Sequence, residues 1–374
     1  MTTELERGLK GLEAAVRLRS LIPRRGYDFS SNDFLGLAES PELKSAVVSA
    51  IERGVPVGSG GSRLLRGNHP EHEALEAEAA AHFGSQSALY FATGFAANAA
   101  IFATLPQRGD LVVHDALIHA SAHDGLRLGR AEVVSVPHND ANAIDDAIAG
   151  WRARGGMGCA WIAVESLYSM DGDTAPLSDL AGIAARHDAM LVIDEAHATG
   201  VLGEGGRGLA ASLEGADNVI TLHTCGKALG ASGALVCGSR TVRDFLINRA
   251  RPFVFSTAPS PLMAATVRAA LQLVSTQPER RRKFAQLVAT GHAAFAKACG
   301  LDSTTGTHIL PIIVGDDRRA VEIARRLQAQ GFDVRAIRPP TVPEGTARLR
   351  VIFTLNVAEP VVEALARATA DALR

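Results

Sequence analysis

Short apolar runs alternate with amphipathic stretches through the middle of the chain. Seven runs are continuous in apolar, often β-branched residues and are bounded by Gly, Asp or Ser, which is typical of strands buried in a parallel sheet. They are SALYFA, DLVVHD, EVVSVPH, CAWIAVES, AMLVIDE, NVITLHT and GALVCGS. Helical patterns lie between several of them, at 71–84, 140–156 and 177–189. This alternation predicts a large α/β domain over 50–240, built on a mostly parallel seven-stranded sheet.

The pattern changes after residue 240, where the helical stretches become longer. Helical periodicity and apolar runs then follow one another at 261–275, 277–299, 308–315, 318–330, 332–337, 347–355 and after Pro360. We therefore expect a smaller C-terminal α+β domain over 241–374. Residues 1–49 are expected to form an N-terminal segment.

Composition narrows the classes of protein to consider. The chain of 374 residues is 47% hydrophobic, enough for a large core, and its net charge of −2 gives no reason to expect a nucleic-acid partner. No apolar run approaches the roughly 20 residues of a membrane span, and the N-terminus lacks the apolar stretch of a signal peptide. The four cysteines show no CxxC spacing. We expect a cytoplasmic protein with reduced thiols and no membrane partner.

Two charged residues follow apolar strand runs. Asp194 closes the run LVID, where a parallel sheet presents side chains to a ligand crevice. Burying a carboxylate alone costs several kcal/mol, so it needs a cationic ligand, an arginine, or a turn that it caps. Lys227 stands among small residues in TCGKALG, just after another strand run. A lysine there can form an imine with an aldehyde, or it can extend along the surface to solvent.

Two further motifs indicate where a ligand could bind. FATGFAAN ends a strand run and opens a helix, so the N–H groups of Gly94 and Phe95 are candidates for a phosphate site, or simply form a strand–helix turn. The segment HDALIHASAHDG contains His114, His119 and His123, whose spacing matches no standard zinc site, so we expect no metal. His119, which opens a helix, is the candidate for a flat contact with an aromatic ligand.

The letters DEAH at 194–197 also occur in nucleic-acid helicases. That chemistry requires a phosphate-binding loop of the form GxxxxGK[ST], and the single GK of this chain is followed by Ala228. Pyridoxal 5'-phosphate (PLP) would instead use all the groups above. Asp194 would bind its ring nitrogen, His119 its ring face and Lys227 its aldehyde. The phosphate would be bound by Gly94, Phe95 and Thr224.

With these residues in place, the chain resembles the α-oxoamine synthases, which are fold-type I PLP-dependent transferases, over nearly its full length. The matching runs are FSSNDFLGL, ATGFAAN, ESLYSMDGDTAPL, VIDEAHATGVLGEGGRG, TCGKALG, FVFSTAPSP and GTARLRVIF. Within the family, RPPTVPEGTARLR and SSNDFLGL are most similar to the members of biotin biosynthesis that join L-alanine to a pimeloyl thioester with loss of CO₂. The resemblance implies a homodimer with shared active sites and pimeloyl-CoA or pimeloyl-acyl carrier protein as the acyl donor.

The resemblance also implies a role for each matching residue. The catalytic residues would be Lys227, His119 and Asp194. The cofactor contacts would be Gly94, Phe95, His119, Ser169, Asp194, His197, Thr224 and Lys227, with Ser256 or Thr257 supplied by a second subunit. The substrate contacts would be Arg19, Asn32, Thr341 and Arg350.

Some alternatives stay open at the level of sequence. Other α-oxoamine synthases use glycine, as 2-amino-3-ketobutyrate CoA ligase and 5-aminolevulinate synthase do, or serine, as serine palmitoyltransferase does. A PLP-binding protein or scaffold without catalytic activity is the alternative from a different class. Such a protein would keep its interactions in Lys227→Ala, whereas an enzyme would lose turnover.

Overall fold

The computed structural model describes residues 2–301 and 305–374. The chain divides into two compact units. The larger unit comprises Leu35–Ser169 and Asp173–Arg281, and the smaller comprises Met1–Phe34, Met170–Gly172 and Arg282–Arg374. No helix within the described residues is long and apolar enough to cross a membrane.

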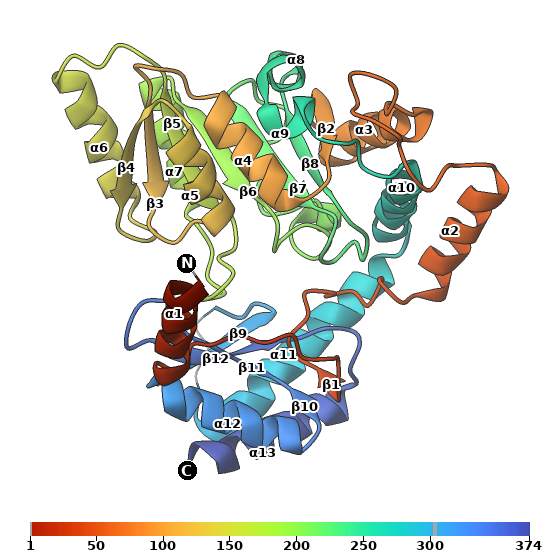
Figure 1. Ribbon diagram of the computed structural model, residues 1–374, viewed down its shortest axis with the longest axis vertical. Coiled ribbons are helices and arrows are strands. Elements are labelled where there is room, and N and C mark those ends of the chain that lie inside the picture. Colours follow the sequence, from red (N-terminus) through yellow and green to blue (C-terminus); the bar gives the residue numbers. More distant parts are fainter. Residues whose placement is uncertain (1, 302–304) are drawn as a thin grey trace. The chain divides into compact units, whose positions relative to one another are not determined.

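The larger unit is built on one seven-stranded sheet, as the apolar runs predicted (Figure 1). In spatial order its strands are β2 (Ser87–Phe91), β8 (Ala234–Gly238), β7 (Val219–Thr224), β6 (Met190–Asp194), β5 (Ala160–Glu165), β3 (Leu111–Asp115) and β4 (Glu132–Val136). Six strands of this sheet run in one direction, and only β8 runs in the opposite direction. The carboxyl ends of β3, β5, β6 and β7 therefore meet at one edge of the sheet.

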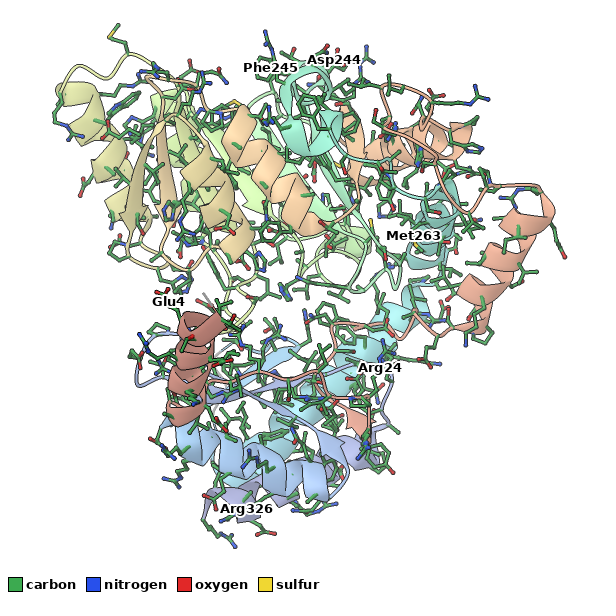
Figure 2. All side chains as sticks on the ribbon, viewed as in Figure 1. Glu4, Arg24, Asp244, Phe245, Met263 and Arg326 are labelled. Atoms are coloured by element: carbon green, nitrogen blue, oxygen red, sulfur yellow. The ribbon has the colours of Figure 1, made fainter. Side chains whose placement is uncertain are left out.

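Helices cover both faces of this sheet, which explains why its inner strands are apolar without alternation. The edge strand β4, which the sequence predicted to be buried, is mostly exposed. One face packs against α4 (Gly94–Thr104), α5 (Ala120–Leu128), α8 (Arg240–Arg249) and α9 (Arg251–Val254). The other packs against α6 (Ala141–Ala153) and α7 (Leu177–His187). Fully buried side chains such as Ile101 and Ile148 each contribute about 1.5–3 kcal/mol to folding. Helix α8 presents Asp244 and Phe245 to solvent (Figure 2).

The larger unit extends beyond the expected range of 50–240 on both sides. α2 (Pro41–Glu52) and α3 (Pro70–Phe83) both pack against α10 (Pro261–Thr276). These contacts place residues 35–49 and 241–281 with the larger unit. A short 3₁₀ helix, Glu204–Gly206, lies in the turn after β6.

The smaller unit combines a three-stranded antiparallel sheet with helices. The sheet has the order β11 (Arg335–Ile337), β12 (Ala347–Ile352) and β9 (Ile309–Gly315). The helices are α1 (Thr2–Ala14), α12 (Asp317–Ala329), α13 (Glu359–Leu373) and most of α11 (Pro278–Cys299). The start of the chain joins this unit because β1 (Tyr27–Asp28) pairs with β10 (Phe332–Asp333). Residues 1–34 therefore belong with the C-terminal part of the chain, and do not form a segment of their own.

Candidate active site

The carboxylate of Asp194 ends β6 at the edge where the parallel strands terminate. In register it pairs with Glu165 on β5 and Leu222 on β7. Its Oδ1 accepts the N–H of Ala196 at 2.9 Å, and its Oδ2 accepts the side-chain N–H of Asn98 at 2.7 Å. Both oxygens of this half-buried carboxylate therefore accept an N–H donor.

Lys227 follows β7 by three residues, and its Nζ lies 2.7 Å from Nε2 of the buried His197. The small residues around the lysine have a steric reason. Gly230 has φ +61, and a Cβ there would lie 2.4 Å from the backbone N of Ala38. A Cβ at Gly200 would lie 2.9 Å from that of Ala228. The tight loop therefore presents one amine beside one imidazole.

His119 is the N-cap of α5, as its place at a helix start predicted. Its Nδ1 accepts the backbone N–H of Ser121 at 3.2 Å and lies 2.7 Å from the Ser121 hydroxyl. Part of the ring reaches solvent, yet the packing around it lowers the pKa of His119; Asp194 opposes this shift and Lys227 adds to it. The three predicted catalytic residues are thus electrostatically linked, and the imidazole is neutral at neutral pH.

The start of α4 offers a place for an anion. Thr93 accepts the N–H of Ala96 at 3.0 Å, and the first N–H groups of a helix, here those of Gly94 and Phe95, have no acceptor inside the helix. A Cβ built at Gly94 would lie 3.6 Å from Thr224 Oγ1. The missing side chain therefore leaves a space lined by amide donors and one hydroxyl, which suits a phosphate group.

Ser256 and Thr257 are exposed in the segment after α9. Ser256 Oγ donates to the carbonyl oxygen of Thr257 at 3.4 Å. Within the described residues, no hydrogen bond joins either side chain to the cluster of Asp194, Lys227 and His119. That a second subunit supplies one of these side chains therefore stays a prediction.

Ser169 lies in the loop that follows β5, and its backbone N–H donates to the carboxyl group of Glu165. Burial raises the pKa of Glu165 well above its ordinary value, and the negative charge of Asp194 adds to this rise. The sequence interpretation missed Glu165. The signal was available, because Glu165 closes a buried strand run just as Asp194 does.

The same loop is held by an imidazole between two carboxylates. His138 lies 2.9 Å from Asp115 at its Nδ1 and 2.7 Å from Asp173 at its Nε2. Burial lowers the pKa of His138, but the hydrogen bonds to Asp115 and Asp173 outweigh it and raise the pKa to about 10. The protonated ring of His138 therefore bridges Asp173 in the loop and Asp115 at the end of β3.

The predicted substrate residues form two pairs in the smaller unit. On β12 the buried Arg350 donates from Nη2 to Asn32 Oδ1 at 3.2 Å. Arg19 donates from Nη2 to Thr341 Oγ1 at 3.0 Å on an exposed surface. Each pair joins residues that are distant in sequence, so the fold brings together what the motifs grouped.

A neighbouring ion pair was not predicted from the sequence. Arg348, two residues before Arg350 on β12, forms a salt bridge with Asp171, which belongs to the same unit.

The three histidines of segment 114–123 were considered above as metal ligands. Among the described residues, no group of three or more His, Cys, Asp or Glu could hold a metal ion.

Comparisons with known proteins agree with the motifs. The family model for class I and II aminotransferases matches residues 24–368. The chain is 45% identical to an 8-amino-7-oxononanoate synthase of Anaeromyxobacter sp. strain Fw109-5, covering 99% of this chain and 96% of that protein. It is 46% identical to the 8-amino-7-oxononanoate synthase of Geobacter sulfurreducens, covering 86% of this chain and 82% of that protein.

A serine palmitoyltransferase from S. paucimobilis, solved with bound PLP–myriocin, has a TM-score of 0.87 and 25% identity. The similarity covers 99% of this chain and 96% of that chain. It confirms the predicted fold class, that of the fold-type I PLP-dependent transferases. The chain therefore belongs to the class I and II aminotransferase family and, with these relatives, to its α-oxoamine synthase branch.

Proposed function

We propose that this protein is an 8-amino-7-oxononanoate synthase, a PLP-dependent acyltransferase of biotin biosynthesis. It would condense L-alanine with a pimeloyl thioester of CoA or an acyl carrier protein, releasing the thiol and CO₂. The observation that carries the proposal is the meeting of Lys227, His197 and Asp194 at one end of a parallel sheet. The names of the relatives at 45% and 46% identity support the choice of substrates.

The donor set fits PLP. An amine, a charged carboxylate and a helix start without a side chain at Gly94 match its aldehyde, pyridine nitrogen and phosphate. We propose that Lys227 holds the aldehyde carbon and Asp194 the ring nitrogen. The remaining contacts would come from His119 at the ring face, His197 and Ser169 at the phenolic oxygen, and Gly94, Phe95 and Thr224 at the phosphate.

When bound, PLP supplies an electron-withdrawing ring that accepts the electron pair left as bonds at the alanine Cα break. Lys227 would take the Cα proton at Nζ, which requires its neutral amine. Lys227 Nζ lies 2.7 Å from His197 Nε2, so the imidazole would position this atom. His119 would donate from Nε2 to the substrate, since its Nδ1 is already an acceptor.

The smaller unit would hold the substrates. Arg350, oriented by Asn32, would bind the alanine carboxylate, because a guanidinium forms paired hydrogen bonds with carboxylates. Arg19 and Thr341 would contact the acyl thioester. Holding the carboxylate fixes which bond at Cα can break, so orientation is the main contribution of this group.

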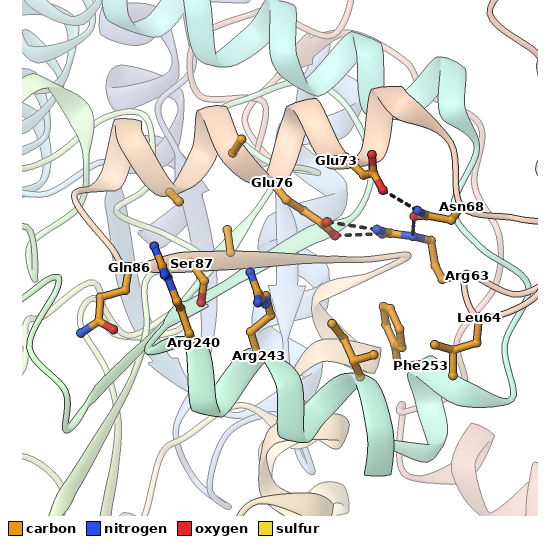
Figure 3. Close-up of a pocket in the computed structure, with 14 residues that line it drawn as sticks. Arg63, Leu64, Asn68, Glu73, Glu76, Gln86, Ser87, Arg240, Arg243 and Phe253 are labelled. Carbon is orange, nitrogen blue, oxygen red and sulfur yellow. Dashed lines mark hydrogen bonds and ion pairs between the residues drawn. The ribbon is translucent and has the colours of Figure 1, made fainter.

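We further propose a homodimer in which Ser256 or Thr257 of the partner subunit completes the phosphate site. In one chain, Ser59 Oγ donates to Pro259 O at 2.6 Å and the N–H of Ala258 donates to Gly61 O at 2.9 Å. The glycine-rich segment 57–69 thereby holds segment 256–260, and the bidentate Arg63–Glu76 pair anchors it at a pocket of roughly 680 Å³ (Figure 3).

Large apolar side chains beside these segments support a covered surface. Leu65 is 85% exposed and Phe255 is 72% exposed. Exposed apolar side chains that gather in one place are typical of protein–protein contacts. Light scattering would test the homodimer, and a monomer at micromolar concentration would contradict it. Double substitution of Ser256 and Thr257 by Ala should then weaken PLP binding while the dimer persists.

The function is tested by mixing the purified protein and PLP with each amino acid and each thioester in turn. The amino acids are alanine, glycine and serine, and the thioesters are pimeloyl-, acetyl-, succinyl- and palmitoyl-CoA together with pimeloyl-acyl carrier protein. Mass spectrometry should find 8-amino-7-oxononanoate from alanine with pimeloyl-CoA, with free thiol and CO₂. Products from glycine or serine alone would assign another α-oxoamine synthase. Bound PLP with no product from any pair would favour a non-catalytic protein.

A further inference from the structure

Asn98 is a polar side chain in a helix whose neighbouring residues are apolar. It lies one turn after Gly94 on α4 and is only 2% exposed, between the buried Ala97 and Ala99. A buried amide without hydrogen bonds costs about 1–3 kcal/mol in proteins, so its contacts matter. Its Nδ2 donates to Asp194 Oδ2 at 2.7 Å and to Ser121 Oγ at 3.0 Å. The orientation of the amide is fixed, because a carboxylate can only accept.

Ser121 carries the chain of hydrogen bonds onward. The residue is fully buried on α5, and its hydroxyl oxygen accepts from Asn98. Its backbone N–H donates to Nδ1 of His119, so this nitrogen is an acceptor. The Ser121 hydroxyl, whose oxygen lies 2.7 Å from Nδ1, therefore donates to it as well. With two donors aimed at Nδ1, the proton of a neutral imidazole must be on Nε2.

All donors in this series run outward from one amide. Asn98 donates to Asp194 on one side and to Ser121 on the other, and Ser121 donates to His119. The series therefore links a carboxylate at the end of β6 to an imidazole at the start of α5 through uncharged groups. Reversing the amide would leave its oxygen facing the carboxylate of Asp194, and the other tautomer of His119 would leave two N–H donors facing each other.

We propose that Asn98 and Ser121 are positioning residues that hold the carboxylate of Asp194 in place and fix the Nε2–H tautomer of His119. The inference rests on the proposed function, in which Asp194 binds the ring nitrogen and His119 the ring face. It adds a property that the function alone does not require: one amide sets the position of the carboxylate and, through Ser121, the tautomer of the imidazole.

The surroundings of His119 agree with this arrangement. The charged and titratable groups that act on it are Asp194, Lys227 and the neighbouring His123. Burial lowers the pKa of His119, Asp194 opposes this shift and Lys227 adds to it. A hydrogen bond donated to Nδ1 can be accepted only by an unprotonated Nδ1, so it also favours the neutral ring. Removing the Ser121 hydroxyl should therefore make His119 easier to protonate.

The test is a histidine titration in the holoenzyme, followed by ¹⁵N NMR and assigned with His119→Gln. In wild type, His119 should show an unprotonated Nδ1 and a protonated Nε2. In Ser121→Ala the pKa of His119 should rise toward the ordinary histidine value of about 6.5. The acid limb of kcat should move in the same direction. Ser87→Ala is the matched control, because it removes a buried hydroxyl that bonds Gly238 and Ser239 instead.

A second variant reverses one step of the series. Asn98→Asp keeps the shape of the side chain but makes it an acceptor for the Ser121 hydroxyl and places a second carboxylate beside Asp194. We expect kcat to fall by at least about 100-fold, the lower range for loss of a positioned proton-transfer group. If this variant does not fold, as judged by circular dichroism, the Ser121→Ala titration still decides.

A wild-type His119 protonated at Nδ1, or the same titration in wild type and Ser121→Ala, would overturn the inference. A failure of the proposed function has a different signature. The wild type would then form no product with any substrate pair, while the tautomer of His119 could still be measured.

Discussion

The two groups of site residues use opposite kinds of polar chemistry. In the larger unit, Asp194 and His119 are held by uncharged donors, Asn98 and Ser121, which determine where protons sit. In the smaller unit, Arg350 and Arg348 contribute fixed positive charges that do not titrate near neutral pH. The larger unit thus orients Asp194 and His119 with neutral hydrogen bonds, whereas the proposed substrate group of the smaller unit carries a permanent charge. This contrast predicts different consequences for substitutions in the two units.

The largest effect is expected at Lys227, the residue proposed to react with the PLP aldehyde. Lys227→Ala removes both the amine that would hold PLP and the proposed base, so kcat should fall by at least about 10³-fold, within the range for loss of acid–base catalysis. Product formation and the PLP absorbance of the purified protein measure it. Lys283→Ala, at an exposed position of α11, is the control and should keep full activity. A Lys227→Ala protein with more than a tenth of wild-type activity would contradict the assignment.

A second comparison separates two arginines on one strand. Arg350→Ala should raise the KM for alanine by roughly 10- to 150-fold, the equivalent of the 1.5–3 kcal/mol of a hydrogen bond to a charged group. Arg348→Ala instead breaks its salt bridge with Asp171 and should lower the free energy of unfolding by about 1–3 kcal/mol, less than for a fully buried pair. Steady-state kinetics and urea unfolding measure the two.

The contrast fails if both arginine variants change the same quantity. An Arg350→Ala protein with unchanged KM and reduced stability would show that Arg350 is a structural residue. Asn32→Ala sharpens the result, because removing the acceptor that orients Arg350 should reproduce part of its effect on KM.

Local sequence pattern was enough to predict which charged side chains lie at the ends of buried strands. Asp194 and Lys227 follow strand runs that are apolar without interruption, and the parallel sheet brings such ends to one edge. The supporting groups were missed, because Asn98 and Asp194 are 96 residues apart and no local pattern links an amide on α4 to a carboxylate on β6. Asn98 lies inside the motif ATGFAAN, in which the sequence predicted a role only for Gly94 and Phe95.

Unit boundaries were also harder to predict than strands. The sequence changes texture near residue 240, yet α10 packs with α2 and α3 and so belongs to the larger unit. Pairing of β1 with β10 joins an N-terminal segment to the C-terminal part of the chain. Both contacts are between segments far apart in sequence, and periodicity within a segment carries no information on its partner.

A smaller effect, on stability, is expected at His138. Its folded pKa is raised from 6.5 to about 10, so its contribution to stability is complete below pH 6.5 and is lost as the pH rises toward 10. The melting temperature of wild type should therefore fall more steeply between pH 6.5 and 10 than that of His138→Gln. Parallel curves for the two proteins would show that the ring is not charged between Asp115 and Asp173.

The smallest effect is expected for Thr341→Val. This change removes the hydroxyl that accepts from Arg19 at an exposed position but leaves the guanidinium in place. A neutral acceptor of this kind contributes about 0.5–1 kcal/mol, so the KM for the acyl thioester should rise by roughly two- to five-fold. Since the charge remains, the KM for alanine should not change. Thr346→Val, which removes an exposed hydroxyl bonded to Pro343, should alter neither KM. If Thr341→Val were as damaging as Arg350→Ala, the smaller unit would depend on neutral hydrogen bonds as the larger one does, and fixed charge would no longer distinguish the two.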